Sequence, residues 1–144
     1  MGGRIATTLS EPGRLWTPNP PADEAAIARL CASAPFEFPA EYLELLRFCN
    51  GGYGEIEAPP LLFWLDPIER AVERNELCHN DGAFAAFWLF GHNGGLEAIA
   101  FDLRERSPLP IVMIDCIAGE GSAKRIADTM ADFVAKIGLP APDA

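Results

Sequence analysis

The sequence predicts a single α+β domain in which a central, mostly antiparallel sheet is covered by about four helices. Stretches with helical and strand-like periodicity do not alternate strictly, as they would in a parallel βαβ fold. A glycine-rich loop at 91–95 separates two apolar stretches, which is typical of a β-hairpin. The length of 144 residues suits one domain, which we place at 22–138 between an N-terminal arm (1–21) and a C-terminal tail (139–144).

The first third of the chain predicts an extended arm followed by two helices. Residues 1–21 contain four prolines and no hydrophobic period, so we expect an extended segment held by Leu15 and Trp16. A helix over 23–32 opens with two acidic residues, which the helix dipole favours. A clearer helix runs from Pro39 to Cys49 with its apolar residues on one face, and Asn50-Gly51-Gly52 ends it.

The middle of the chain predicts two short strands and a third helix. The strands are 54–57 and 61–65, which two prolines separate. Asp66 occupies an N-cap position before Pro67, and an acid follows at the third helical position, so a helix should run from there to about Cys78.

The second half predicts a series of strands and a closing helix. Segments 84–90 and 96–103 flank the glycine loop, and the apolar segment 110–117 is a further strand. The last helix is expected over 122–137, because apolar residues recur there on one helical stripe.

The charge of the chain restricts the partners it can have. There are 21 acidic and 11 basic residues, for a formal net charge of −10. This balance opposes binding to nucleic acid or to an anionic membrane, because both need a basic footprint. Residues 37–81 hold ten of the acids against three arginines. This acidic middle third is either a solvated face that keeps the protein soluble or a surface for a basic partner.

The cysteines and the apolar runs predict a cytoplasmic protein. Cys31, Cys49, Cys78 and Cys116 are scattered and form no C-x-x-C pair, unlike the cysteines of a secreted disulfide scaffold. The first residues lack the apolar stretch of a signal peptide, and the longest apolar runs are too short to span a bilayer.

Residues that could carry chemistry do not form a recognisable set, so the sequence predicts no catalysis, cofactor or metal site. His79 directly follows Cys78, and sequence neighbours rarely converge as a nucleophile and its base. Residues 119–124 lack the spacing of a phosphate loop and indicate a turn with a serine N-cap. Asp115 and Asp102 lie in apolar strands, and we expect each to accept hydrogen bonds from a loop.

An ordered set of motifs resembles one known family. Residues 39–52, PAEYLELLRFCNGG, resemble the P-x-x-[YF]-x-x-[LF]-L-x-x-x-N-G-G signature of the SUKH superfamily, the Smi/Knr-type domain. Residues 90–95 and the strand ending at Asp102 resemble that family's glycine hairpin and following strand, although His92-Asn93 stand where the family often has an acid. The resemblance covers roughly 23–137.

The resemblance implies a non-catalytic α+β domain that recognises another protein. Bacterial members are similar to immunity proteins that neutralise toxins, many of them nucleases, and fungal members resemble regulators of cell-wall synthesis. Because toxic nucleases commonly present a basic cleft, an acidic partner fits this role by charge complementarity. We therefore expect an immunity protein that binds a basic toxin domain. The alternatives are a regulatory or scaffold module, or a ligand-binding domain or hydrolase with Cys78, His79 or Asp115 in an aromatic pocket.

Two sets of residues follow from this interpretation. The expected partner contacts are six acids and two aromatic anchors: Glu55, Glu57, Glu69, Glu73, Glu76, Asp81, Tyr53 and Trp64. The expected structural residues, which set backbone geometry or end a strand, are Asn50, Gly51, Gly52, Gly91, Gly94, Gly95 and Asp102.

Overall fold

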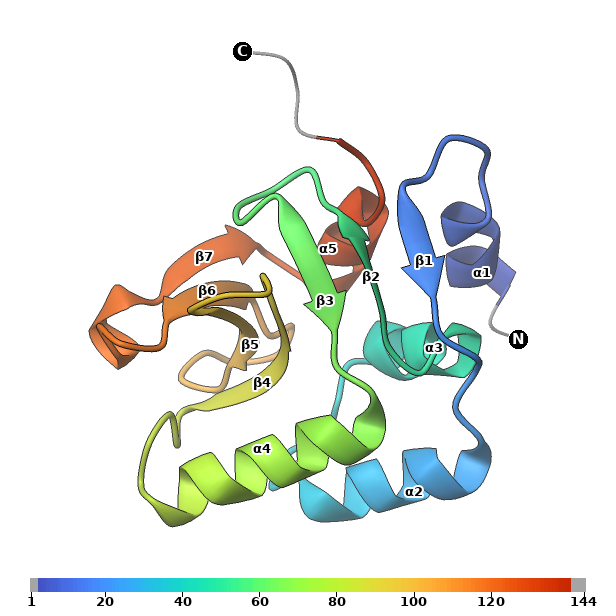
Figure 1. Ribbon diagram of the computed structural model, residues 1–144. Helices are drawn as coiled ribbons and strands as arrows, with labels where there is room; N and C mark the ends of the chain where they lie inside the picture. The colour runs from blue at the N-terminus through green and yellow to red at the C-terminus, as the bar shows by residue number, and fades with distance from the viewer. Residues whose placement is uncertain (1–2, 141–144) are drawn as a thin grey trace.

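The computed structural model describes residues 3–140 and confirms the α+β class (Figure 1). Within these residues, seven strands form one antiparallel sheet in which each strand pairs with the next in the chain. The strands are β1 (Trp16–Pro18), β2 (Gly52–Glu55), β3 (Leu62–Leu65), β4 (Phe87–His92), β5 (Glu97–Asp102), β6 (Ile111–Asp115) and β7 (Lys124–Ala127). The helices are α1 (Gly3–Leu9), α2 (Glu24–Ser33), α3 (Ala40–Phe48), α4 (Ile68–Asn80) and α5 (Met130–Lys136), with a 3-10 turn η1 (Glu120–Ser122).

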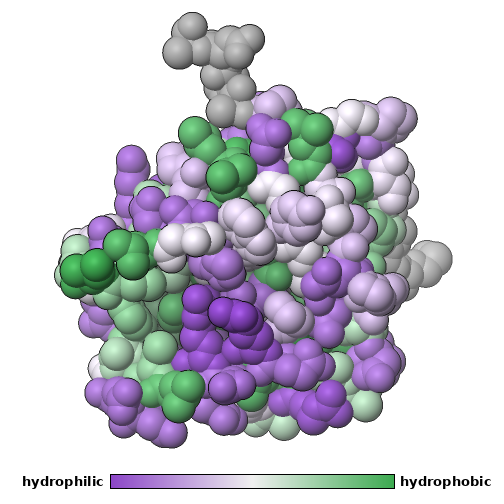
Figure 2. Space-filling view, in the orientation of Figure 1, coloured by the Kyte–Doolittle hydropathy of each residue, from purple (hydrophilic) through white to green (hydrophobic). Residues whose placement is uncertain are grey.

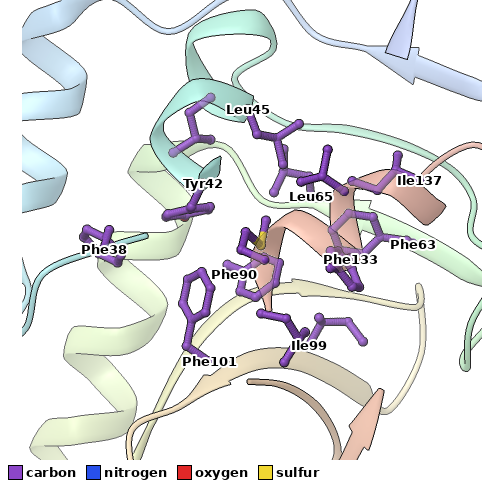
Figure 3. Close-up of a cluster of buried hydrophobic side chains, with 14 of the residues drawn as sticks. Phe38, Tyr42, Leu45, Phe63, Leu65, Phe90, Ile99, Phe101, Phe133 and Ile137 are labelled. Atoms are coloured by element: carbon purple, nitrogen blue, oxygen red, sulfur yellow. The ribbon is translucent and has the colours of Figure 1, made fainter. Parts of the chain in front are cut away.

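The main core lies between the helices and one face of the sheet. In Figure 1, α3 and α5 lie behind the strands, and α2 and α4 run along the lower edge. Tyr42 and Leu45 of α3 are fully buried, and the Tyr42 ring lies 5.5 Å from that of Phe90 in β4. Figure 3 shows these side chains in one cluster with Phe133 of α5 and with Ile137, which follows that helix. We call the opposite face of the sheet the outer face.

The outer face is covered over one half of the sheet and open over the other. Over β4–β6 it carries a second buried cluster, made of Phe87, Leu89, Ala98, Ala100, Val112 and Ile114. Phe84 and Ala86, before β4, and Ala123, before β7, pack against this cluster. Over β2, in contrast, Tyr53 is 50% exposed.

Helix α4 takes the place of a strand beside β4. Strand β3 pairs with β4 only through Trp64–His92 and Leu65–Gly91. Farther along β4, the buried amide of Asn75 donates to the Leu89 carbonyl and accepts from the Leu89 N–H, both at 2.8 Å. The main-chain groups of Leu89, which face no strand on that side, are therefore satisfied by a helix side chain.

The N-terminal segment differs from the predicted extended arm. Residues Gly3–Leu9 form α1, and Trp16–Pro18 form β1, which pairs with β2. Ile5 and Leu9 lie one helical turn apart and are both buried in the core. Tertiary packing therefore stabilises a helix that is too short to persist alone. Residues 1–2 of the predicted arm and 141–144 of the predicted tail lie outside the described residues.

The predicted helix over 122–137 is wrong in its first part. Lys124–Ala127 is strand β7, and the helix begins only at Met130. Ile126 fits a helical stripe, but this segment pairs with β6 instead. The true N-cap is Thr129, whose hydroxyl accepts from the Asp132 N–H at 3.1 Å. Ser122 ends η1 rather than capping a helix, and its hydroxyl accepts from the Asp115 N–H at 2.8 Å.

The predicted N-cap at Asp66 is also wrong. The Ile68 N–H at the start of α4 donates to Oδ1 of Asn50 at 2.8 Å, so a residue that follows α3 caps α4. Asn50 therefore links two helices in addition to its expected backbone role. Gly51 adopts φ +98°, and a Cβ there would lie 3.0 Å from the Leu65 carbonyl oxygen, so this position requires glycine.

None of the helices in 3–140 is long and apolar enough to cross a lipid bilayer.

Candidate partner-binding surface

A row of stacked rings crosses the open part of the outer face. Tyr53, Trp64 and His92 are cross-strand partners on β2, β3 and β4. The ring centroids of Tyr53 and Trp64 are 6.0 Å apart with an interplanar angle of 18°, and those of Trp64 and His92 are 5.7 Å apart at 7°. We call these three residues the aromatic ladder.

The aromatic ladder is held in place from the hairpin side. Gly94 adopts φ +82° in the β4–β5 turn and packs onto Trp64, where an added Cβ would lie 2.9 Å from the indole ring. A shallow hollow of about 510 Å³ borders Tyr53 and Trp64 and is also lined by Leu15, Leu62 and Glu55. A stacked aromatic side chain that is half exposed suits an interface anchor, because binding costs it little rotamer freedom.

A buried carboxylate joins the ladder to helix α4. The Asp66 side chain is only 1% exposed. Nη1 of Arg74 donates to Oδ2 of Asp66 at 2.9 Å, and Nε of Arg70 lies 3.9 Å from Oδ1. Nε2 of His92 lies 3.5 Å from the same Oδ1. Two arginines and one histidine thus surround a single buried acid.

The hydrogen bonds of His92 determine its tautomer. The Gly94 N–H donates to Nδ1 of His92 at 2.9 Å, so the neutral ring carries its proton on Nε2, facing Asp66. Burial lowers the pKa of His92, against the opposing effect of the Asp66 charge. Burial also raises the pKa of Asp66, while Arg74, His92 and Arg70 oppose that shift.

Helix α4 carries acids and arginines on different flanks. Glu69, Glu73 and Glu76 recur with helical spacing on one stripe, which begins near α2, where Arg29 lies 4.0 Å from Glu69. Arg70 and Arg74 occupy the neighbouring stripe, where both approach Asp66. The arginine flank is therefore the one beside the ladder.

The expected partner contacts accordingly fall into three groups. Tyr53, Trp64 and Glu55 lie together around the ladder. The acids of α4 form a separate stripe, and Asp81 follows as the C-cap of that helix. Glu57 lies elsewhere, beside α5, where its N–H donates to the Lys136 carbonyl at 3.1 Å. The expected single acidic surface is thus divided among three places.

Figure 2 shows the hydropathy of the molecule in the orientation of Figure 1. Hydrophilic side chains gather over α4 in the lower centre, whereas the area over β2 and β3 takes intermediate colours. Apolar side chains gather over the β2–β3 turn and over the connection that follows β6.

Sequence reasoning missed three residues of this surface: His92, Arg70 and Arg74. The glycine loop was interpreted only as backbone geometry, yet His92 ends β4 and extends the ladder. The contact between Trp64 and His92 depends on the β3–β4 register. The local sequence pattern does not reveal how two residues 28 positions apart are paired.

The residues considered for chemistry have structural contacts. Nε2 of His79 lies 2.9 Å from the Phe87 carbonyl oxygen, on the β4 edge beside α4. Oδ1 of Asp115 accepts from the Ile117 and Ala118 N–H groups at 2.8 and 3.0 Å, which confirms the expected hydrogen bonds to a loop. The hydrogen bonds from Ala118 and Ile117 lower the pKa of Asp115. The Arg104 side chain donates to Asp102 at 2.9 Å, and this hydrogen bond lowers the pKa of Asp102.

The fold and the surface together define a small α+β domain in which one sheet face is partly open and carries stacked aromatic rings. The model of the SMI1 / KNR4 family (SUKH-1) matches residues 21–136, which is most of the chain. The protein therefore belongs to this family, as the Asn-Gly-Gly motif and the glycine hairpin indicated. A comparison with individually curated proteins found no significant match.

Proposed function

We propose that this protein is an immunity protein of the SUKH type, which binds a cognate toxin domain and neutralises it. The observation that carries the proposal is the partly exposed aromatic ladder on the outer face of β2–β4, with Tyr53 half exposed at its end. Family membership supports a domain that contacts another protein. The net charge of −10 favours a basic partner such as a nuclease domain.

Two parts of the surface have different tasks in this proposal. Tyr53 and Trp64 are the anchor, because stacked aromatic side chains bury a large area at low entropic cost. The acid stripe of α4 acts at longer range, because exposed charges attract an oppositely charged partner and speed its association. Arg70 and Arg74 are paired with Asp66, so they repel a basic partner less than two unpaired arginines would.

The test is a rescue of growth in a bacterial host. Toxin-like domains encoded beside this gene are expressed alone or together with the full chain, either wild type or carrying Tyr53→Ala and Trp64→Ala. We expect the wild type to restore growth with one of these domains and the double variant to restore it much less. Ile117→Ala is the matched control, because Ile117 is 76% exposed and lies after β6.

Two outcomes contradict the proposal at different levels. If the chain suppresses none of the neighbouring toxic domains, the immunity role is wrong, and a regulatory or scaffold role remains for a SUKH domain. If the double variant protects as well as the wild type, the immunity role stands and the ladder is not its interface.

A further inference from the structure

A groove on the helix side of the sheet, opposite the outer face, has the composition of a second docking site. It lies between the segment that leads into α3 and the connection from β5 to β6, and it has a volume of about 550 Å³. We call it the α3 groove. This volume lies within the range of clefts that hold ligands or partner side chains.

The α3 groove has an apolar floor that is part of the main core. Phe38, Leu109 and Met130 are between 1% and 9% exposed and line the groove from below. Figure 3 shows Phe38 at one end of the buried cluster, beyond Tyr42 and Phe101. Phe36 lies partly exposed on the wall, with its ring 4.7 Å from that of Phe38. Because these side chains are packed already, the groove exists before anything binds.

The rim of the groove is acidic. Glu37, Glu41 and Glu105 line it, and Glu105 is paired with Arg125 at 3.2 Å. Among the residues whose side chains the structure describes, no arginine or lysine nitrogen lies within 4.0 Å of the Glu37 or Glu41 carboxylate. Glu41 also lines a neighbouring hollow of about 340 Å³ with Glu44, so the acidic edge continues along α3.

We infer that the α3 groove binds a cationic amphipathic segment of a partner protein. An apolar side chain of that segment enters the groove over Phe38 and Met130, while its lysine or arginine side chains reach Glu37 and Glu41. Charge complementarity selects this occupant, because a second copy of the chain would bring another net charge of −10 against the same rim. The site is separate from the aromatic ladder, so it goes beyond the proposed immunity function.

The test is an NMR titration of the isotope-labelled full chain with a defined probe. The probe is a synthetic peptide of leucine and lysine arranged with helical periodicity. We expect chemical-shift changes in residues 36–41 and 103–109. The double variant Glu37→Lys/Glu41→Lys should weaken binding about tenfold. The matched control Glu120→Lys/Asp128→Lys has the same net charge and should bind within about twofold of the wild type.

Three outcomes would overturn the inference. Equal weakening by both double variants would mean that only overall charge attracts the peptide. Shifts confined to α4 or to the outer face would place the site elsewhere. Equal binding of a peptide with serine in place of leucine would remove the role of the apolar floor. Because Glu37 and Glu41 are not part of the ladder, their reversal should leave growth rescue intact, so this inference and the proposed function can fail separately.

Discussion

The half of the sheet formed by β4, β5 and β6 is buried on both faces, whereas β2 and β3 are covered mainly on one. In the first half, Phe90 faces the helices and Leu89 faces the outer cluster, and both are at most 2% exposed. In the second half, Phe63 is fully buried against the helices, while Tyr53 on the outer face is 50% exposed. In one sheet, β4–β6 thus pack on both faces, whereas β2 and β3 pack against the core on one face and leave an aromatic side chain exposed on the other.

The largest expected effect on stability comes from removing one large side chain from the half of the sheet that is buried on both faces. Phe90→Ala removes a ring that lies 4.7 Å from Phe101 and 5.7 Å from Phe133. We expect the free energy of unfolding to fall by about 3–5 kcal/mol, because a large cavity opens in a packed core. Urea unfolding followed by circular dichroism measures this loss. A loss below about 1 kcal/mol would show that the two halves are equally tolerant.

A somewhat smaller loss of stability is expected from a substitution in α4, at the place where this helix lies beside β4 instead of a strand. Asn75→Ala leaves the N–H and carbonyl groups of Leu89 without their partners inside the protein. Because each orphaned buried group costs about 1–3 kcal/mol, the variant should unfold more easily by roughly 2–5 kcal/mol. The same urea titration checks it. Faster hydrogen exchange at Leu89 would locate the effect at this contact, and unchanged exchange there would contradict it.

On β2, whose outer face is open, we expect a substitution to weaken partner binding much more than it lowers stability. Tyr53→Ala should change the free energy of unfolding by about 1 kcal/mol or less, because the ring is half exposed. Affinity for the cognate toxin domain, measured by calorimetry, should fall about 30-fold or more if Tyr53 is an anchor. A variant that loses stability but keeps its affinity would reverse the comparison.

The acid stripe of α4 should act on association alone. Glu73→Lys/Glu76→Lys should slow binding of the toxin domain about tenfold at low salt and leave dissociation nearly unchanged. Stopped-flow kinetics at several salt concentrations measures both rates. Glu120→Lys/Asp128→Lys has the same net charge and serves as the control. If both pairs slow association equally, total charge rather than the stripe attracts the partner.

The smallest expected effect is on the pH dependence of stability and comes from His92, where β4 pairs with β3. Because burial lowers the pKa of His92 below its ordinary value of 6.5, the unfolded chain takes up a proton before the folded one does. The contribution of neutral His92 to the free energy of unfolding is therefore fully present above pH 6.5. It is lost as the pH falls through the lowered pKa of His92 in the folded protein. Urea unfolding from pH 7.5 to 5 should show a steeper loss for the wild type than for His92→Gln. Parallel curves would contradict this assignment.

Local patterns predicted the elements that long periodic segments or caps define. The helix expected over 23–32 is α2, although Asp23 is its N-cap, accepting from the Ala26 N–H, and not its first residue. The expected hairpin joins β4 and β5, although Gly91 and His92 of the predicted loop belong to β4. The predicted helix over 122–137 failed because a strand that pairs with β6 can carry the same apolar residues as a helix. In such an edge segment, sheet pairing outweighs the helical pattern.

The candidate surface was predicted only in part, because its geometry depends on tertiary register. Tyr53 and Trp64 were both identified, but nothing in the sequence pattern places His92 against Trp64 or Asn50 beside the start of α4. Asp66 had the sequence context of a cap, and only the packing of α4 against β4 turns it toward Arg74. Contacts of this kind follow from the fold and not from the neighbouring residues.

The order of the strands has a consequence for synthesis on the ribosome. Each strand pairs with the one made just before it, so the sheet can grow strand by strand as the chain emerges. The guanidinium of Arg14, however, donates to the carbonyl oxygens of Ala135 and Ile137 at 3.0 and 2.7 Å. This contact between segments more than 120 residues apart can therefore form only after residue 137 has left the exit tunnel.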